Sequence, residues 1–99
     1  MAVEARDYEV VVILSPEIGD EAIEASLERL SQGVTSRGGE VTEVNHWGRR
    51  RLAYPIKRFL EGNYVVSQIK LDPMQVPQLE SSLRISEEVI RHIIVKAGE

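Results

Sequence analysis

The alternation of hydrophobic and polar residues predicts three regular β-strands. Residues 8–14 (YEVVVIL) are apolar on nearly both faces, which is typical of a strand in the middle of a sheet. Residues 63–71 (NYVVSQIKL) alternate between the two kinds of side chain, and a turn containing Gly62 and Asn63 is expected just before this strand. Residues 88–96 (EVIRHIIVK) alternate in the same way and predict a strand near the end of the sequence.

A further strand is expected in the middle of the chain, although its pattern is irregular. Val41 and Val44 are three positions apart and therefore out of phase in a regular strand, so we expect a bulge near Thr42 or Glu43. Pro55 has no amide hydrogen to give to a sheet ladder, which indicates an edge strand. This strand should pair with the one that follows it as a hairpin.

Two amphipathic helices are predicted between the strands. Asp20 is expected to cap the first, which the glycine pair at 38–39 ends, and its apolar positions are Ile23, Leu27, Leu30 and Val34. The second is shorter, with apolar residues at Val76, Leu79 and Leu83. It should begin near Gln75 because Pro77 fits only in a first turn, which argues against Asp72 as its cap.

The elements therefore follow one another as strand, helix, strand, strand, helix, strand. This βαββαβ order is the split βαβ, or ferredoxin-like, arrangement of the α+β class. Right-handed crossovers place the first and third strands in the middle of a four-stranded antiparallel sheet, with both helices on one face. We expect residues 1–99 to form a single domain, with a flexible start at 1–6 and a short tail at 97–99.

The opposite face of the predicted sheet has no helix to cover it. Alternation places Glu9, Val11 and Ile13 on that face, together with either Tyr64 or Val65. An uncovered face that carries an aromatic residue can stack bases or accept a protein partner.

The composition is that of a soluble globular domain, with 42% hydrophobic and 28% charged residues. The chain has no cysteine, which excludes disulfides, thiolate metal sites and cysteine nucleophiles and suits the cytoplasm. It has no recognisable signal sequence and no apolar run near the ~18 residues of a membrane span, so no membrane association is expected. The net charge of −4 argues against polyanion binding unless the charges are unevenly distributed.

The charges are in fact unevenly distributed. Residues 1–43 hold ten acidic and three basic residues, and residues 61–99 hold six and four. Residues 44–60, which we call the basic segment, hold five basic residues and no acidic one. Four of the five are arginines, whose planar guanidinium suits phosphate, although many charged runs are only solvated surfaces.

Alternation within the basic segment is expected to send Arg49 and Arg51 to one side, with Trp47, and Arg50 to the other. Two residues on the side of Arg50 are expected in the core, Leu52 and Tyr54. Arg50 could contact a partner or merely neutralise nearby glutamates. Trp47 could stack on a base or guanidinium, contact a partner, or simply pack the hairpin.

No catalytic site is expected. His46 and His92 are too few for a metal site and are expected to be structural. The sequence contains no glycine-rich phosphate loop and no nucleophile elbow. Some acyl-phosphate hydrolases share the predicted fold, but the loop SPEIGDE after the first strand is acidic and would repel such a substrate. We therefore expect no enzyme activity, cofactor, metal or small-molecule substrate.

Four stretches carry a more specific pattern: RDYEVVVILSP, WGRRRLAYPI, GNYVV and LRISEEVIRHIIVK. Together they resemble the family of bacterial small-subunit ribosomal protein six, over residues 6–96. The central motif is the most specific, since Gly-x-Arg-Arg-Leu-Ala-Tyr-Pro-Ile is matched from Gly48 to Ile56. The resemblance implies the split βαβ fold, a place in the small subunit of cytoplasmic ribosomes, contact with small-subunit (16S) ribosomal RNA, and pairing with small-subunit ribosomal protein eighteen.

The candidate RNA-binding residues are cations of the basic segment and of the predicted strand and helix ends: Arg6, Arg49, Arg50, Arg51, Lys57, Arg58, Arg84 and Arg91. The candidate contacts to a protein partner are Trp47, Tyr64 and Arg91. Several members of the family have a longer C-terminal extension than the residues after Lys96 here, so contacts made by such an extension are not carried over. The alternative function is a non-ribosomal ferredoxin-like module for regulation or dimerisation, with the basic segment as an anion site.

Overall fold

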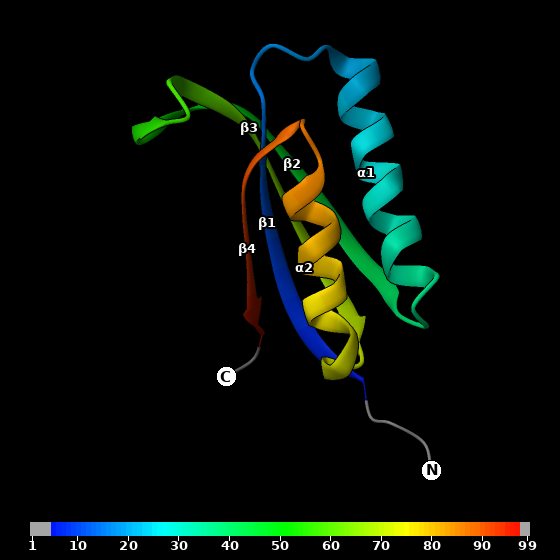
Figure 1. The fold of residues 1–99 in the computed structure, drawn as a ribbon. Helices are drawn as coiled ribbons and strands as arrows, with labels where there is room; N and C mark the ends of the chain where they lie inside the picture. Colours follow the sequence, from blue (N-terminus) through cyan, green and yellow to red (C-terminus); the bar gives the residue numbers. More distant parts are fainter. Residues whose placement is uncertain (1–4, 98–99) are drawn as a thin grey trace.

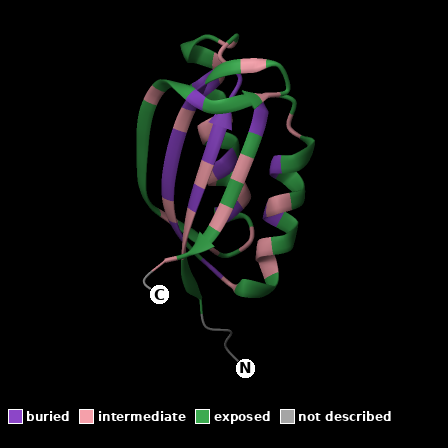
Figure 2. Ribbon diagram, turned by 90° about the vertical axis from the view of Figure 1, so that its left-hand side faces the viewer, coloured by how far each residue is buried: buried purple, intermediate pink, exposed green. Residues whose placement is uncertain are grey.

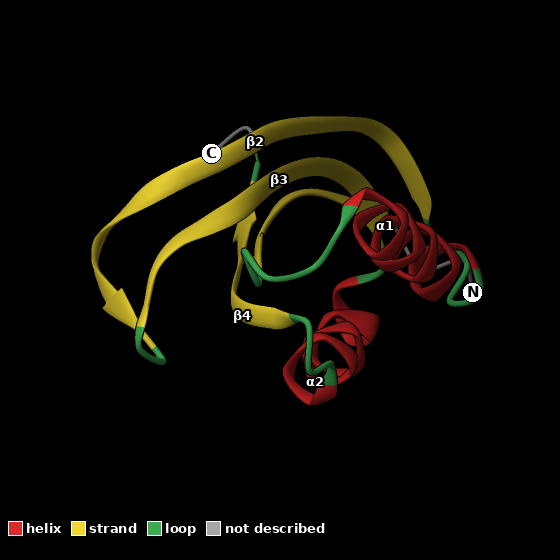
Figure 3. Ribbon diagram, turned by 90° about the horizontal axis from the view of Figure 1, so that it is seen from above, coloured by secondary structure: helices red, strands yellow, loops and turns green. Residues whose placement is uncertain are grey.

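A computed structural model describes residues 5–97 and shows a sheet covered by two helices (Figure 1). The elements in chain order are β1 (Arg6–Leu14), α1 (Asp20–Thr35), β2 (Glu40–Ile56), β3 (Phe59–Leu71), a short 3-10 helix (Pro73–Gln75), α2 (Val76–Ile85) and β4 (Val89–Lys96). The antiparallel sheet has the strand order β2-β3-β1-β4, and both helices cover one face of it (Figure 3). The expected ferredoxin-like order and layering are therefore confirmed.

The two ends of the chain were expected to lie outside the packed fold. Residues 1–4 of the expected flexible start at 1–6 lie outside the described residues, and Arg6 is the first residue of β1. Residues 98–99 of the expected tail also lie outside them. None of the helices within residues 5–97 has the length and apolar character needed to cross a membrane.

The core lies between the helices and the sheet, and β1 is central to it. Val10 and Val12 face the helices and are 0% and 4% exposed, while Ile13 is buried on the opposite face. The helices contribute one apolar stripe each, with buried residues at Ile23, Leu30, Val34, Leu79 and Leu83. The apolar spacing that predicted the two helices therefore also identifies the sides that pack against the sheet.

The helix starts differ in detail from the sequence interpretation. Gly19 occupies the N-cap position of α1, so the prediction that Asp20 caps this helix is wrong; Asp20 lies in the first turn, where its carboxylate complements the helix dipole. Asp72 does act as a cap, because its carboxylate accepts a hydrogen bond of 2.9 Å from the backbone N–H of Met74. It caps the 3-10 helix, however, and α2 itself begins at Val76.

Strand β2 is an edge strand with three irregularities. The first lies between Val41 and Glu43, which confirms the expected bulge. The second lies between His46 and Gly48, and Gly48 has a φ of 86°, in the left-handed region that favours glycine. The third surrounds Pro55, which cannot donate to the ladder. These irregularities change which side of the sheet the residues of the basic segment face.

The hairpin turn lies at Lys57 and Arg58, whose φ angles are 49° and 69°. It joins Ile56 and Phe59, which pair directly across the two strands. The prediction of a turn at residues 62–63 is therefore wrong, and β3 begins four residues earlier than expected. Two-residue hairpin turns with positive φ at both positions match the twist of the strands, but asparagine and glycine usually occupy them.

Gly62 and Asn63 lie inside β3 for reasons of packing. A Cβ atom at Gly62 would lie only 2.4 Å from Cγ2 of Ile13, so the two strands pack too closely there for any side chain. Asn63 is buried, and its side-chain nitrogen donates a 3.0 Å hydrogen bond to the carbonyl oxygen of Ser15. Residues that are typical of turns thus serve a close strand contact and a buried polar contact.

The far end of the hairpin extends past β1 and curls round toward β4 (Figure 3). It is held there by a second, smaller cluster on the face without helices, formed by Ile13, Leu52 and Ile90 and by the partly buried Ile56, Phe59 and Tyr64. Of the two residues expected on this face, Tyr64 is the correct one, because Val65 is fully buried under the helices. Figure 2 shows the outer strand β2 exposed along most of its length beside the buried central strands.

Replacement of Gly62 by alanine tests the close contact beneath the hairpin. We expect Gly62→Ala to lower the free energy of unfolding by about 1–3 kcal/mol, because Ile13 or the backbone must move. Gly33→Ala is the matched control, since a Cβ there meets its neighbours at 3.6 and 3.7 Å, which is ordinary contact, and alanine favours the helix. Urea unfolding of both variants measures the difference, and equal stabilities would contradict the packing described.

Candidate nucleic-acid interface

The basic segment forms an exposed edge of the sheet and the tip of its hairpin. Arg49, Arg50 and Arg51 lie on β2, and Lys57 and Arg58 form the turn. All five residues are exposed to solvent. The five cations nevertheless have different surroundings, which separate those that hold the hairpin from those that are available to a ligand.

Arg50 belongs to a stack of planar groups. Its guanidinium carbon lies 5.2 Å from the centre of the Trp47 ring, and the Trp47 ring stacks on Tyr64 with centres 6.3 Å apart and an angle of 10° between planes. We call Arg50, Trp47 and Tyr64 the aromatic stack. The expectation that Trp47 shares a side with Arg49 and Arg51 is wrong, because the bulge at Gly48 interrupts the alternation and brings Trp47 to the side of Arg50.

Arg49 is bound within its own molecule. It donates a 2.6 Å hydrogen bond from Nη2 to the carbonyl oxygen of Pro16, and its Nε lies 3.8 Å from a carboxylate oxygen of Glu61. These contacts tie β2 to the loop after β1 and to β3. Arg51, by contrast, makes no hydrogen bond or ion pair within residues 5–97, although it is directly opposite Glu61 in the strand pairing.

Tyr54 is 56% exposed, so the expectation that it lies in the core is wrong, whereas Leu52 is buried as expected. The reason is that the hairpin runs beyond the end of β1 at this point and leaves no second layer over Tyr54. Its hydroxyl accepts a 2.5 Å hydrogen bond from Nη1 of Arg91, and the guanidinium carbon lies 5.9 Å from the Tyr54 ring centre. Sequence reasoning missed this pair because it joins residues 37 positions apart.

The candidate RNA-binding residues outside the basic segment lie at opposite ends of the sheet. Arg84 in the last turn of α2 and Arg91 on β4 lie around a hollow that also includes Lys57 from the hairpin turn. His92, interpreted from the sequence as structural, lines the same hollow. Arg6 begins β1 at the opposite end of the sheet, and the structure does not bring it near the others (Figure 1).

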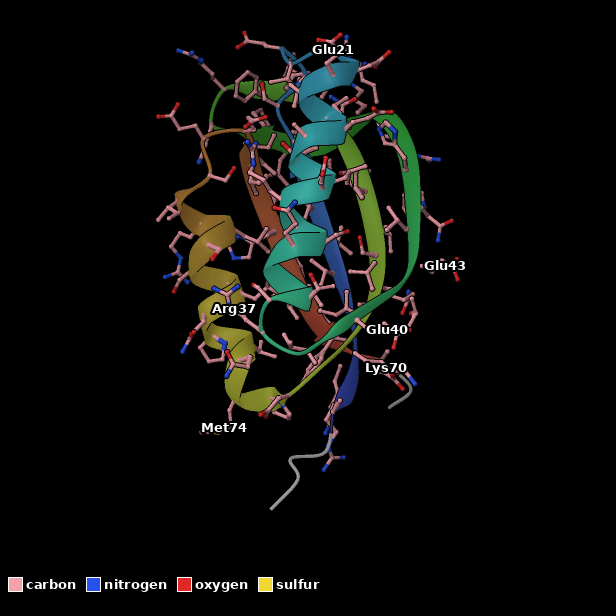
Figure 4. The ribbon with its side chains drawn as sticks, turned by 90° about the vertical axis from the view of Figure 1, so that its right-hand side faces the viewer. Glu21, Arg37, Glu40, Glu43, Lys70 and Met74 are labelled. Carbon is pink, nitrogen blue, oxygen red and sulfur yellow. The ribbon has the colours of Figure 1, made fainter. Side chains whose placement is uncertain are left out.

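Two further arginines serve the helix layer. Arg29 forms an ion pair of 2.5 Å with Glu88, in the loop between α2 and β4. Arg37 reaches from the end of α1 toward α2 (Figure 4), where it donates to the carbonyl of Gly33 at 2.7 Å and to the hydroxyl of Ser82 at 3.4 Å. These contacts explain why neither residue belongs to the candidate interface.

The acidic residues of α1 lie on the other layer of the molecule. Glu21, Glu24 and Glu28 are exposed on α1, which covers the sheet face opposite the aromatic stack (Figure 4 labels Glu21). Residues 5–97 contain no group of three histidine, aspartate or glutamate side chains that could hold a metal ion. The geometry therefore combines a cationic hairpin with an uncovered aromatic and apolar face, and this combination suits a polyanion or a protein partner.

Comparison with known proteins identifies close relatives. The family model described as "Ribosomal protein S6" matches residues 7–96. The chain is 47% identical to the small ribosomal subunit protein bS6 of Dehalococcoides mccartyi, over 95% of this chain and 86% of that protein. It is 39% identical to bS6 of Desulforamulus reducens, over 95% and 99%. The crystal structure of 30S ribosomal protein S6 from Thermotoga maritima matches with a TM-score of 0.89 and 32% identity, covering 94% of this chain and 88% of that one.

The variants Arg49→Ala and Arg51→Ala each remove one positive charge from β2, so their stabilities can be compared directly. We expect Arg49→Ala to lower the free energy of unfolding by about 1 kcal/mol, because it removes a hydrogen bond that anchors the hairpin. Arg51→Ala should change it by less than about 0.5 kcal/mol, since the side chain is exposed and unpaired within the described residues. Thermal and urea unfolding of the two variants checks this difference, and a larger loss in Arg51→Ala would contradict the assignment.

Proposed function

Because the chain belongs to the family of bacterial small-subunit ribosomal protein S6, we propose that it binds 16S ribosomal RNA through its cationic hairpin and pairs with small-subunit ribosomal protein eighteen. Membership makes it a structural protein of the small ribosomal subunit and not an enzyme. It leaves no support for the alternative of a non-ribosomal regulatory module. The proposed location is the cytoplasmic ribosome.

The RNA proposal is supported by the exposure of cations along one two-stranded ribbon. Arg51 and Lys57 make no hydrogen bond or ion pair within residues 5–97, and Arg58 lies only against the Phe59 ring, at 5.9 Å. No acidic residue occurs between positions 44 and 60. A row of unpaired arginine and lysine side chains on a fixed backbone is suited to the phosphates of a folded RNA.

The net charge of −4 makes contact geometry more important than long-range attraction. A chain that is acidic overall gains little from electrostatic steering toward a polyanion, and the nearby negative charges reduce the attraction further. Recognition should therefore depend on the shape and phosphate positions of a folded RNA, since proteins read structured RNA mainly through these features. Arg49 contributes by holding the hairpin, while Arg50, Arg51, Lys57 and Arg58 face outward from it.

The face without helices supports the proposed protein contact. The aromatic stack lies on this face, with Trp47 51% exposed, and Ile93 and Val95 of β4 are 40% and 44% exposed. Aromatic residues surrounded by exposed aliphatic side chains are typical of the centre of a protein interface. We therefore assign the partner protein to this face, with Arg91 at its border, where the hydrogen bond to Tyr54 holds the guanidinium in place.

A salt series of RNA binding tests the cationic hairpin. The logarithm of the binding constant should fall linearly as the logarithm of the salt concentration rises. In Arg51→Ala this fall should be less steep, by about 0.7–0.9 in the slope. Lys70→Ala is the control, because it removes the same charge from the opposite end of β3. Filter binding to a 16S ribosomal RNA fragment makes the measurement, and identical slopes in Arg51→Ala and the unaltered protein would exclude Arg51 from the interface.

Trp47 is the most sensitive probe of the partner face. We expect Trp47→Ala to weaken binding to small-subunit ribosomal protein eighteen by about 2 kcal/mol, roughly 30-fold, as is typical of a tryptophan at the centre of an interface. Met74→Ala is the control, because Met74 is 76% exposed but lies in the helix layer (Figure 4). Calorimetric titration compares the two, and equal weakening by both variants would place the partner elsewhere.

A further inference from the structure

Four basic residues from three separate elements line one hollow at the end of the molecule. Lys57 comes from the hairpin turn, Arg84 from the last turn of α2, and Arg91 and His92 from β4. The hollow has a volume of about 230 Å³, and Leu83 and Ile90 contribute apolar walls. Among the described residues that line it, none is acidic. We call this hollow the end pocket.

The side chains of the end pocket have the hydrogen-bonding capacity that a phosphate needs. Arg91 uses one nitrogen, Nη1, for the Tyr54 hydroxyl, which orients the guanidinium and leaves its other N–H groups available. Lys57 adds a compact cation with three N–H donors.

Arg84 is the weakest member of the group. Its Nη2 lies 3.7 Å from a carboxylate oxygen of Glu80, one helical turn earlier, and the carbonyl end of α2 is close by. Both features reduce the positive potential at Arg84 but do not cancel it, since the Glu80 contact is long and exposed to solvent. The pocket therefore keeps a clear positive charge from Lys57, Arg91 and part of Arg84.

The conformation of the hairpin turn gives a second, independent reason to assign a function here. Lys57 and Arg58 both have positive φ, at 49° and 69°, where asparagine followed by glycine is the common choice. Side chains other than glycine are strained in this region, and such strain concentrates at functional sites. The turn thus carries a lysine at the end pocket at a cost in stability.

We propose that the end pocket binds a single phosphodiester group of RNA, at a position separate from the aromatic stack and from Arg51. The proposal rests on the proposed function and deepens it by fixing one phosphate between the hairpin turn, α2 and β4. It also explains why the hairpin curls toward β4, since the curl brings Lys57 beside Arg91.

Two turn variants separate strain from phosphate binding. Lys57→Asn and Arg58→Gly each remove one positive charge and relax one strained position, so both should raise the melting temperature, by roughly 5 °C. Of the two turn residues, Lys57 lines the end pocket and Arg58 does not. We therefore expect Lys57→Asn, but not Arg58→Gly, to abolish the response of the pocket to a small phosphate probe.

The probe is the dinucleotide UpU, which has one phosphodiester group, with uridine as the control that lacks it. In NMR titrations the guanidinium signals of Arg91 and the backbone amide signal of His92 should shift with UpU in the unaltered protein and in Arg58→Gly. They should not shift with uridine, nor with UpU in Lys57→Asn. They should shift less with UpU in a second variant, Arg84→Gln, whose residue is exposed and whose loss should not disturb folding. Shifts in Lys57→Asn equal to those of the unaltered protein would overturn the proposal.

Binding of the 16S ribosomal RNA fragment distinguishes failure of this proposal from failure of the proposed function. If Lys57→Asn binds this RNA as tightly as Arg58→Gly does, while Arg51→Ala binds it more weakly, the end pocket is not a phosphate site although the hairpin still binds RNA. If none of these variants differs from the unaltered protein, the proposed function itself fails. Support requires that Lys57→Asn lose several-fold more affinity than Arg58→Gly.

Discussion

The position of the hairpin depends on one close contact, between the backbone of β3 at Gly62 and the side chain of Ile13 on β1. A Cβ at position 62 would lie 2.4 Å from Ile13, so glycine alone allows this approach. Ile13 then packs with Leu52 and Ile90 in the small second cluster, which holds the overhanging hairpin against the start of β4. Together with the hydrogen bond from Arg49 to Pro16, this contact fixes the position of the cationic ribbon relative to the sheet, and a binding site needs such a rigid scaffold.

The arginines divide into those that build the fold and those that remain available to a ligand. Arg29 and Arg37 hold the helix layer, and Arg49 holds the hairpin through the carbonyl of Pro16. Arg50 and Arg51 stay exposed on β2, the first beside Trp47 and the second unpaired within residues 5–97. A count of basic residues in the sequence cannot make this distinction, because it depends on contacts between distant segments. The same limit explains why the Arg91–Tyr54 pair and the end pocket were not predicted.

The fold could be predicted from the sequence because the core pattern is regular. Helical spacing of Ile23, Leu30 and Val34, and β-branched alternation in β1, identified the elements and their order. The sequence predictions are wrong where a residue that is typical of one structural role has another role in this fold. Gly62 was interpreted as a turn residue but permits a close contact, and the single bulge residue at Gly48 reverses the side on which Trp47 lies. The turn itself was missed because Lys57 and Arg58 are not typical of its backbone conformation.

We propose that the hairpin is the part of the fold that contacts RNA in the small ribosomal subunit. This contact can be tested by ultraviolet cross-linking of purified small subunits that contain this protein, followed by mass spectrometry of its peptides. We predict RNA adducts on peptides from residues 47–58, and none on peptides from the acidic helix α1, residues 20–35. Adducts confined to α1, with residues 47–58 unmodified, would contradict the account.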